Sequence, residues 1–259
     1  MKDRINYKGK IFKSWQLISY IDAGGNGEVW LCHNTQKEEF AFKLLSKIRQ
    51  KAYQRFCDEI EVVRRNQDIK GILPIIDFDL PKDQSKSIPW YVMPKATPIS
   101  KIVIDKSAKE KIEILIPLAE TLSSLHKRNI SHRDIKPSNI LFYNGRAHPS
   151  DFGLADYPEK KDITLKGESV GPKWTMAPEM RRNAESADGI MADSYSFAKT
   201  LWILLTGQNK GFDGQYNSDS VVGLKNFLKL PIYLKPIDDL FTVCTDNKPQ
   251  GKGDRFIFA

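Results

Sequence analysis

Cysteine and long apolar runs are the two features that this 259-residue sequence most clearly lacks. The three cysteines, Cys32, Cys57 and Cys244, are odd in number and scattered, which excludes a disulfide framework and favours a reducing compartment. The longest apolar runs, such as residues 201–205, fall far short of the roughly 18 residues that a membrane-spanning helix needs. The N-terminus is polar, without the apolar core of a signal peptide. We therefore expect a cytoplasmic protein with no membrane partner.

Blocks of like charge are also absent. The chain has 40 Lys and Arg against 32 Asp and Glu, a net charge of +8, but no run of five or more basic residues. Aromatic residues do not alternate with basic ones, as they would in a platform on which single-stranded bases stack. A solvated basic surface is therefore favoured over a nucleic-acid site, and we expect no specific nucleic-acid partner.

The first part of the chain, up to about residue 94, has the pattern of a β-rich region. One helix interrupts it at about residues 51–66, where Phe56, Ile60 and Val63 are spaced by three and four. The predicted strands are residues 15–21, 28–33, 39–44, 72–78 and 90–93.

After this point the pattern becomes helical. Helices are predicted at residues 108–126 and 193–206, and Pro117 predicts a kink in the first of them. We place the boundary between the sheet-rich and the helical part near residues 94–96.

The most specific segment of the sequence is His132-Arg133-Asp134-Ile135-Lys136-Pro137-Ser138-Asn139, which is followed by Asp151-Phe152-Gly153 and Ala177-Pro178-Glu179. Asp134, Asn139 and Asp151 carry oxygen atoms in short polar loops, where they can converge on a hard cation. The order HRDxKxxN, DFG and APE resembles the catalytic core of the eukaryotic-type (Hanks-type) serine/threonine protein kinases. Taken singly, each residue has a plainer role as a turn cap or a surface charge, but their order and spacing favour the functional interpretation.

Three upstream features extend this resemblance over nearly the whole chain. Phe40-Ala41-Phe42-Lys43 resembles the lysine motif on the third strand of the family. Glu59 falls on the predicted helix and is the expected ion-pair partner of Lys43. Residues 21–29 occupy the place of the glycine-rich phosphate loop, with Gly24 and Gly27 at the second and third family glycines.

The resemblance implies an α+β, bilobal protein-kinase-like fold, with a small β-rich N-lobe at residues 1–94 and a larger, mainly helical C-lobe at residues 95–259. It implies transfer of the γ-phosphoryl group of ATP to a serine or threonine hydroxyl of a protein substrate, with Mg²⁺ as the metal. Lys136 followed by Pro137 is typical of serine/threonine kinases, and therefore predicts this acceptor type.

The resemblance also implies roles for individual residues. Lys43 is expected to hold the α- and β-phosphates, and Glu59 to orient Lys43. Asp134 is expected to accept the proton of the substrate hydroxyl. The remaining expectations are that Lys136 offsets charge on the phosphoryl group and that Asn139 and Asp151 bind Mg²⁺.

An apolar adenine pocket is implied as well. We expect it to be lined by Ile21, Val29, Ala41 and Leu141, with Met93 limiting its depth. Since Pro94 has no N–H, the backbone donor to adenine is expected from Ala96.

Departures from the family pattern concern the nucleotide and the acceptor. Asp22 replaces the first family glycine, and we expect its carboxylate to weaken ATP binding modestly. Asn26 replaces the usual aromatic residue at the tip of the loop. Pro172 stands where serine/threonine kinases usually have a threonine whose hydroxyl contacts the catalytic Asp and Lys, and proline has no hydroxyl.

Regulation and structural anchoring are expected from seven further positions. Arg133 beside Asp134 predicts control by phosphorylation between DFG and APE, with Thr164 and Ser169 as candidate sites. Autophosphorylation through a transient dimer is expected, and Glu168 is an alternative source of negative charge. Two anchors are expected in addition, Asp193 bracing the catalytic-loop backbone and Glu179 pairing with Arg255.

Two functions from other classes remain open. A pseudokinase, a nucleotide-binding scaffold module without phosphoryl transfer, is favoured by Asp22, Asn26 and Pro172. It is disfavoured because Lys43, Glu59, Asp134, Asn139 and Asp151 are all present. A small-molecule phosphotransferase of related fold is disfavoured by Lys136 and the APE segment, which suit a protein acceptor.

Overall fold

The computed structural model of the chain describes residues 5–24, 27–46, 49–81, 83, 87–158, 160, 174–182, 187–228 and 234–246. Contacts between residues divide the chain into two units. Unit 1 comprises residues 1–67 and 73–96, and unit 2 comprises residues 68–72 and 97–259. This division differs in two places from the predicted boundary between residues 94 and 95, because unit 1 extends to Ala96 and residues 68–72 group with unit 2.

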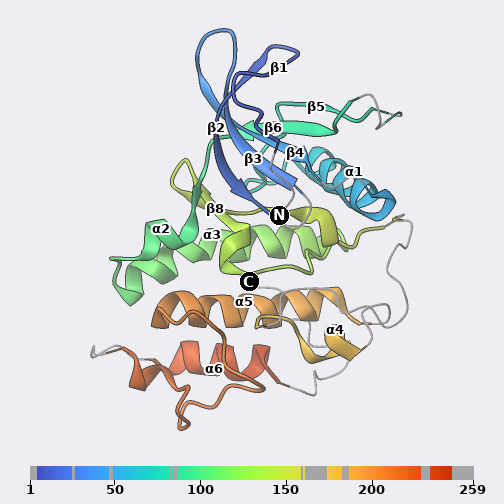
Figure 1. The fold of residues 1–259 in the computed structure, drawn as a ribbon. Helices are drawn as coiled ribbons and strands as arrows, with labels where there is room; N and C mark the ends of the chain where they lie inside the picture. Colours follow the sequence, from blue (N-terminus) through green and yellow to red (C-terminus); the bar gives the residue numbers. More distant parts are fainter. Residues whose placement is uncertain are drawn as a thin grey trace. The chain divides into compact units, whose positions relative to one another are not determined.

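Unit 1 is built on a six-stranded antiparallel sheet with the order β1-β2-β3-β4-β6-β5 (Figure 1). Helix α1 (Gln50–Arg65) follows β4 along the chain, close to the predicted 51–66. The strands are β1 (Ile11–Phe12), β2 (Trp15–Ala23), β3 (Gly27–His33), β4 (Glu39–Leu45), β5 (Asp77–Asp79) and β6 (Trp90–Pro94).

Successive side chains of the central strands point to opposite faces of the sheet, and both faces carry buried residues. Phe42 pairs with both Trp30 and Val92 in register, and these side chains belong to an aromatic-rich cluster on one face. One residue further along β4, Lys43 pairs with Val29 and Tyr91 and therefore faces the other side. Helix α1 packs on this second side through the cluster Leu45, Ala52, Phe56, Ile60 and Tyr91.

The predicted strand at residues 72–78 is wrong for residues 72–76, since β5 comprises only Asp77–Asp79. The preceding segment is held by contacts inside unit 2. The Nη1 and Nη2 atoms of Arg128 donate to the Asp68 carboxylate, and His148 Nδ1 lies 2.9 Å from Gly71 O. A Cβ on Gly71 would lie 1.8 Å from Thr121 Oγ1, so glycine is required for this close approach. The apolar run that follows leads from this anchor to β6, where the N–H of Ile76 donates to Val92 O at 2.8 Å just before the β5 pairing begins.

Unit 2 consists mainly of helices, with a three-stranded antiparallel sheet of order β7-β8-β9. Helix α3 begins with a capping box between Ser107 and Glu110 and continues on both sides of Pro117. The strands are β7 (Thr97–Pro98), β8 (Ile140–Tyr143) and β9 (Arg146–Pro149). The helices are α2 (Ile99–Val103), α3 (Ala108–Lys127), α4 (Pro178–Arg182), α5 (Gly189–Thr206) and α6 (Lys235–Cys244), with short 3₁₀ turns η1 (Pro137–Asn139), η2 (Phe152–Leu154) and η3 (Leu224–Asn226).

Helix α5 forms the centre of unit 2. Fourteen of its 18 residues are buried, as expected for a helix that packs on several sides. It lies between α3 and α6 (Figure 1). It begins four residues before the predicted start, because Asp188 caps it by accepting from the backbone N–H groups of Ile190 and Met191.

Helix α5 contains a buried lysine with an unusual environment. Lys199 is 1% exposed, and its Nζ donates to the backbone carbonyls of Phe212 and Gly214 at 2.7 and 2.6 Å. Burial lowers the pKa of Lys199 to about 7. Above this pH the native side chain is neutral, whereas an unfolded lysine still binds its proton up to about pH 10.4.

We expect this difference to make stability rise with pH, because the unfolded state binds more protons. From about pH 7 to about pH 8.5, the free energy of unfolding of the wild type should increase by about 1.5 kcal/mol relative to Lys199→Met. Urea unfolding at the two pH values measures this change, with Lys225→Met at an exposed site as the matched control. A pH dependence that is the same in the wild type and Lys199→Met contradicts the prediction.

Candidate functional site

A buried ion pair joins β4 to α1 in unit 1. Lys43 Nζ donates to both carboxylate oxygens of Glu59 at 2.8 Å, and the two side chains are 14% and 3% exposed. The predicted pair is therefore present. The Tyr91 hydroxyl also donates to Glu59 Oε1, at 2.9 Å, which holds the carboxylate from a third element. Tyr91 has no motif of its own, and its one sequence signal is its place two residues before Met93, on the same face of β6.

The sheet face around Lys43 carries three of the residues predicted to bind adenine. Val29 is the partner of Lys43 in register, and Ala41 is the partner of Met93. Ala41 lies two residues before Lys43 on β4, so both side chains point to the same face. Ala41 is buried, and Val29 and Met93 are half-buried. Unit 1 thus gathers an apolar group beside a lysine, which suits a nucleotide base next to its phosphates.

Three other predicted adenine residues are placed differently. Ile21 is 45% exposed on β2. Ala96 is half-buried just after β6, and Leu141 lies on β8 in unit 2, where it pairs with His148 and Pro98. Their contribution to nucleotide binding stays a prediction.

The two predicted phosphate-loop glycines have different structural roles. A Cβ on Gly27 would lie 2.7 Å from the backbone oxygen of Leu44, so glycine is needed there for the pairing of β3 with β4. Gly24 N donates to Gly27 O at 2.9 Å, and a Cβ on Gly24 would meet open space. Asp22 Oδ1 accepts from the N–H of Ala23 at 2.8 Å. Asn26 lies outside the described residues, and weakening of ATP binding by Asp22 stays a prediction.

In unit 2, the catalytic-loop motif forms a buried hydrogen-bonded cluster around Asp134. Lys136 Nζ donates to the Asp134 carboxylate at 2.9 and 3.1 Å. Asn139 Nδ2 donates to Asp134 Oδ2 at 2.7 Å and to its backbone oxygen at 3.0 Å. Asp134 is 5% exposed, and burial raises its pKa, with the charge of Lys136 opposing the rise and that of Asp151 adding to it. The loop therefore fixes one carboxylate between two donors.

Asn139 and Asp151 present oxygen atoms that fit a hard cation such as Mg²⁺. The amide nitrogen of Asn139 is engaged by Asp134, so its Oδ1 is the atom that can ligate a metal. Asp151 has a φ of 64° and directly precedes η2. Within the described part of the chain, no group of three or more His, Cys, Asp or Glu side chains gathers as a metal site. Two protein ligands are consistent with Mg²⁺, which usually takes further ligands from substrate phosphates and water.

Asp193 on α5 braces the backbone of the catalytic loop, as predicted. Its oxygens accept from the N–H groups of His132 and Arg133, each at 2.7 Å, and the side chain is fully buried. His126 Nε2 lies 3.0 Å from Asp193 Oδ2, a contact for which the sequence gives no separate signal. Gly189, one turn earlier, lets α5 approach, because a Cβ there would lie 2.2 Å from Ser131 Oγ. Asp193 therefore lies in the second turn of its helix, not at its start.

The segment around DFG packs against the same loop. His132 Nε2 lies 3.0 Å from Ser150 O, and the His132 ring lies 4.6 Å from that of the buried Phe152. Arg133 Nη2 lies 3.5 Å from Asp156 Oδ2, so the arginine expected to bind a phosphorylated side chain pairs here with a carboxylate. Five predicted positions lie outside the described residues: Thr164, Glu168, Ser169, Pro172 and Arg255. Because Arg255 is the predicted partner of Glu179, this ion pair also stays a prediction.

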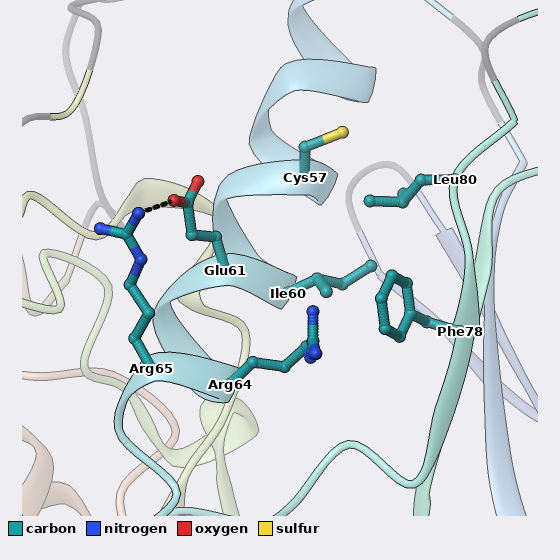
Figure 2. A pocket seen from close by; sticks show the side chains of 7 residues that line it. All are labelled: Cys57, Ile60, Glu61, Arg64, Arg65, Phe78 and Leu80. Atoms are coloured by element: carbon teal, nitrogen blue, oxygen red, sulfur yellow. Dashed lines mark ion pairs between the residues drawn. The ribbon is translucent and has the colours of Figure 1, made fainter.

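A separate pocket of about 400 Å³ lies beside α1 in unit 1. In Figure 2, Ile60 and Arg64 point toward Phe78 and Leu80, and the Arg64 guanidinium lies 4.6 Å from the Phe78 ring centre. The other lining residues are Cys57, Glu61 and Arg65, of which the last two form an ion pair at 2.6 Å. None of the predicted nucleotide residues lines this pocket. It is therefore distinct from the group around Lys43.

A family model described as a protein kinase domain matches residues 15–236. The chain belongs to the protein kinase family. The predicted family is thus confirmed, and the kinase motifs named above fall within the matched range. The curated relatives are themselves named as protein kinases, mostly of the serine/threonine type.

Individual kinases match most of this chain at moderate sequence identity. The chain is 31% identical over 252 residues to the dual specificity protein kinase shkB of Dictyostelium discoideum, covering 91% of this chain and 38% of that protein. It is 28% identical over 238 residues to the serine/threonine-protein kinase PknD of Mycobacterium tuberculosis, covering 85% of this chain and 33% of that protein. For AfsK of Streptomyces griseus the identity is 25% over 201 residues, covering 74% and 24%.

The fold is confirmed by a solved kinase domain with a TM-score of 0.65 at 17% identity, which covers 82% of this kinase chain and 70% of the solved one. The chain spans only 24% to 38% of the length of the curated relatives given above. No helix within the described ranges is both long and apolar enough to cross a membrane. The cytoplasmic location stays a prediction.

Proposed function

We propose that this protein kinase chain is an ATP-dependent serine/threonine kinase, which transfers the γ-phosphoryl group of ATP to protein hydroxyls and phosphorylates itself. The observation that carries the proposal is the buried Asp134 carboxylate, held between Lys136 Nζ and Asn139 Nδ2. The Lys43–Glu59 pair supports the nucleotide side of the same proposal.

The residues of unit 2 act on the acceptor. Asp134 orients the substrate hydroxyl and accepts its proton as the new bond to phosphorus forms. The raised pKa of this carboxyl brings it closer to neutral pH, which favours its action as a base. Lys136 hydrogen-bonds the carboxylate and supplies a positive charge beside the group being transferred.

The nucleotide is bound by other residues. Lys43 pairs with the α- and β-phosphates, and Glu59, fixed in turn by Tyr91, keeps the ammonium group in place. Val29, Ala41 and Met93 provide the apolar face for adenine. Asn139 and Asp151 would hold Mg²⁺, which when bound neutralises charge on the phosphates.

The acceptor type follows from the catalytic loop. Lys136 and Pro137 have the pattern of serine/threonine kinases, and two of the three relatives described above carry that name. The third is named as dual specificity, so tyrosine phosphorylation is the outcome to test against.

The purified chain should be incubated with γ-labelled ATP, Mg²⁺ and casein, alongside Asp134→Asn prepared in the same way. We expect label on casein and on the wild-type chain, mostly as phosphoserine and phosphothreonine, and background label with the variant. A rate of self-labelling per molecule that rises with protein concentration supports a transient dimer. Mainly phosphotyrosine contradicts the acceptor assignment.

A scaffold function is the second candidate, favoured by the carboxylate of Asp22 in the nucleotide loop. A thermal shift with ATP and Mg²⁺ but no transfer of label to any acceptor supports the scaffold and contradicts the kinase. Label transfer to metabolites without any protein acceptor identifies a small-molecule phosphotransferase instead.

A further inference from the structure

Three hydroxyl groups converge where the segment before the APE motif meets the catalytic loop. Thr175 Oγ1 donates to the backbone oxygen of Ile135 at 3.0 Å. Thr200 Oγ1 on α5 reaches the same oxygen at 3.4 Å, and Ser196 Oγ donates to Thr175 O at 2.8 Å. All four residues are buried, with exposed fractions of 4% or less. Thr175 therefore links the APE segment to the catalytic loop with its side chain and to α5 with its backbone.

The position of Ile135 makes this contact significant. Its carbonyl belongs to the peptide group between Ile135 and Lys136, one residue after Asp134. A donor to that oxygen fixes the plane of the peptide, and with it the directions in which the flanking side chains leave the backbone. Lys136 and Asp134 are hydrogen-bonded to each other, so both depend on the same backbone orientation.

The contact with Thr175 is the stronger of the two hydroxyl contacts on this oxygen. At 3.0 Å it lies within the usual range for a hydrogen bond, whereas the Thr200 contact at 3.4 Å lies beyond it. Without the Thr175 hydroxyl, the longer contact with Thr200 would be the only described donor to the buried Ile135 carbonyl. The peptide group would then be free to rotate more widely.

The sequence indicates why the hydrogen bond from Thr175 to the catalytic loop matters in this chain. Pro172, three residues earlier, has no hydroxyl with which to reach the loop. We propose that Thr175 is a positioning residue, whose hydroxyl sets the orientation of Asp134 and Lys136 and so couples the APE segment to phosphoryl transfer. This inference rests on the proposed kinase function and names a residue of the same site.

The test is a series at one position. Thr175→Val removes the hydroxyl at nearly constant volume, Thr175→Ser keeps it, and Thr175→Cys replaces it with a weak donor. Thr206→Val is the matched control, because Thr206 Oγ1 donates to Trp202 O within α5, away from the loop. For each variant, kcat, the KM for ATP and the thermal unfolding midpoint are measured with the acceptor that the wild type labels best.

We expect Thr175→Val to lower kcat roughly 10- to 100-fold through misplacement of the reacting groups. The KM for ATP should stay within about twofold of the wild type, because the contact lies on the acceptor side. Thr175→Ser should recover most of kcat, and Thr175→Cys should be intermediate. Thr206→Val should keep the wild-type kcat.

Two results would overturn the inference. One is a kcat of Thr175→Val within about threefold of the wild type. The other is a kcat that correlates with the unfolding midpoint across the series and not with the presence of a hydroxyl. This includes the case in which Thr175→Val does not fold and Thr175→Ser is as strongly impaired. An inactive but folded wild type contradicts the proposed kinase function itself, which distinguishes the two failures.

Discussion

Asp134→Asn is expected to lower kcat about 10²- to 10⁴-fold, the usual contribution of a positioned base, while the chain stays folded. An amide cannot take the proton of the acceptor hydroxyl. It also places an NH₂ group where Asp134 now receives hydrogen bonds from Lys136 and Asn139. Stability should change little, because burial already disfavours the charged form of this carboxyl, as its raised pKa shows. Initial rates with labelled ATP, together with thermal unfolding, measure both effects.

Asp219→Asn is the matched control, since Asp219 is exposed and pairs only with Lys225 among the contacts described for it. Its kcat should equal that of the wild type. The wild-type kcat should also fall as the pH drops through the pKa of Asp134, which burial places above the ordinary value near 4. A folded Asp134→Asn protein that keeps wild-type kcat removes the carboxylate from the mechanism.

Local signals in the sequence predicted the elements that carry the site. The spacing of Phe56, Ile60 and Val63 placed α1 to within a residue at each end. The order of the family motifs predicted the contact between Lys43 and Glu59, which depends on one strand and one helix of fixed geometry. The bounds of α1 and the Lys43–Glu59 contact therefore depend on short stretches of sequence around the residues themselves.

Contacts between distant segments that no family motif marks were not predictable in this way. Tyr91 and Glu59 are separated by 32 positions, Thr175 and Ile135 by 40, and His126 and Asp193 by 67. Each depends on how the backbone runs between its ends, and none carries a local pattern. The misassignment of residues 72–76 to a strand has the same cause, because their apolar side chains resemble a strand while the anchor at Gly71 lies outside the pattern.

Asp193→Asn is expected to reduce the free energy of unfolding by about 1–3 kcal/mol, the usual cost of leaving a buried hydrogen-bonding group without its partner. The Asp193 carboxylate accepts two backbone N–H groups and contacts His126, and it is fully buried. An asparagine has one oxygen, so either His132 N or Arg133 N must face an NH₂ group. Since native domains are stable by only about 5–15 kcal/mol, urea unfolding should show a large shift of the midpoint.

Asp188→Asn in the same helix is the matched control, because asparagine caps a helix about as well as aspartate and the free energy should change by less than about 0.5 kcal/mol. Asp193→Asn should in addition lower kcat under conditions in which the variant is still folded, since the backbone that it braces leads directly into Asp134. An unfolding free energy within about 0.3 kcal/mol of the wild type would contradict the prediction, because one of the two buried N–H groups would then lose its acceptor at almost no cost. The brace thus links the stability of unit 2 to the placement of its catalytic carboxylate.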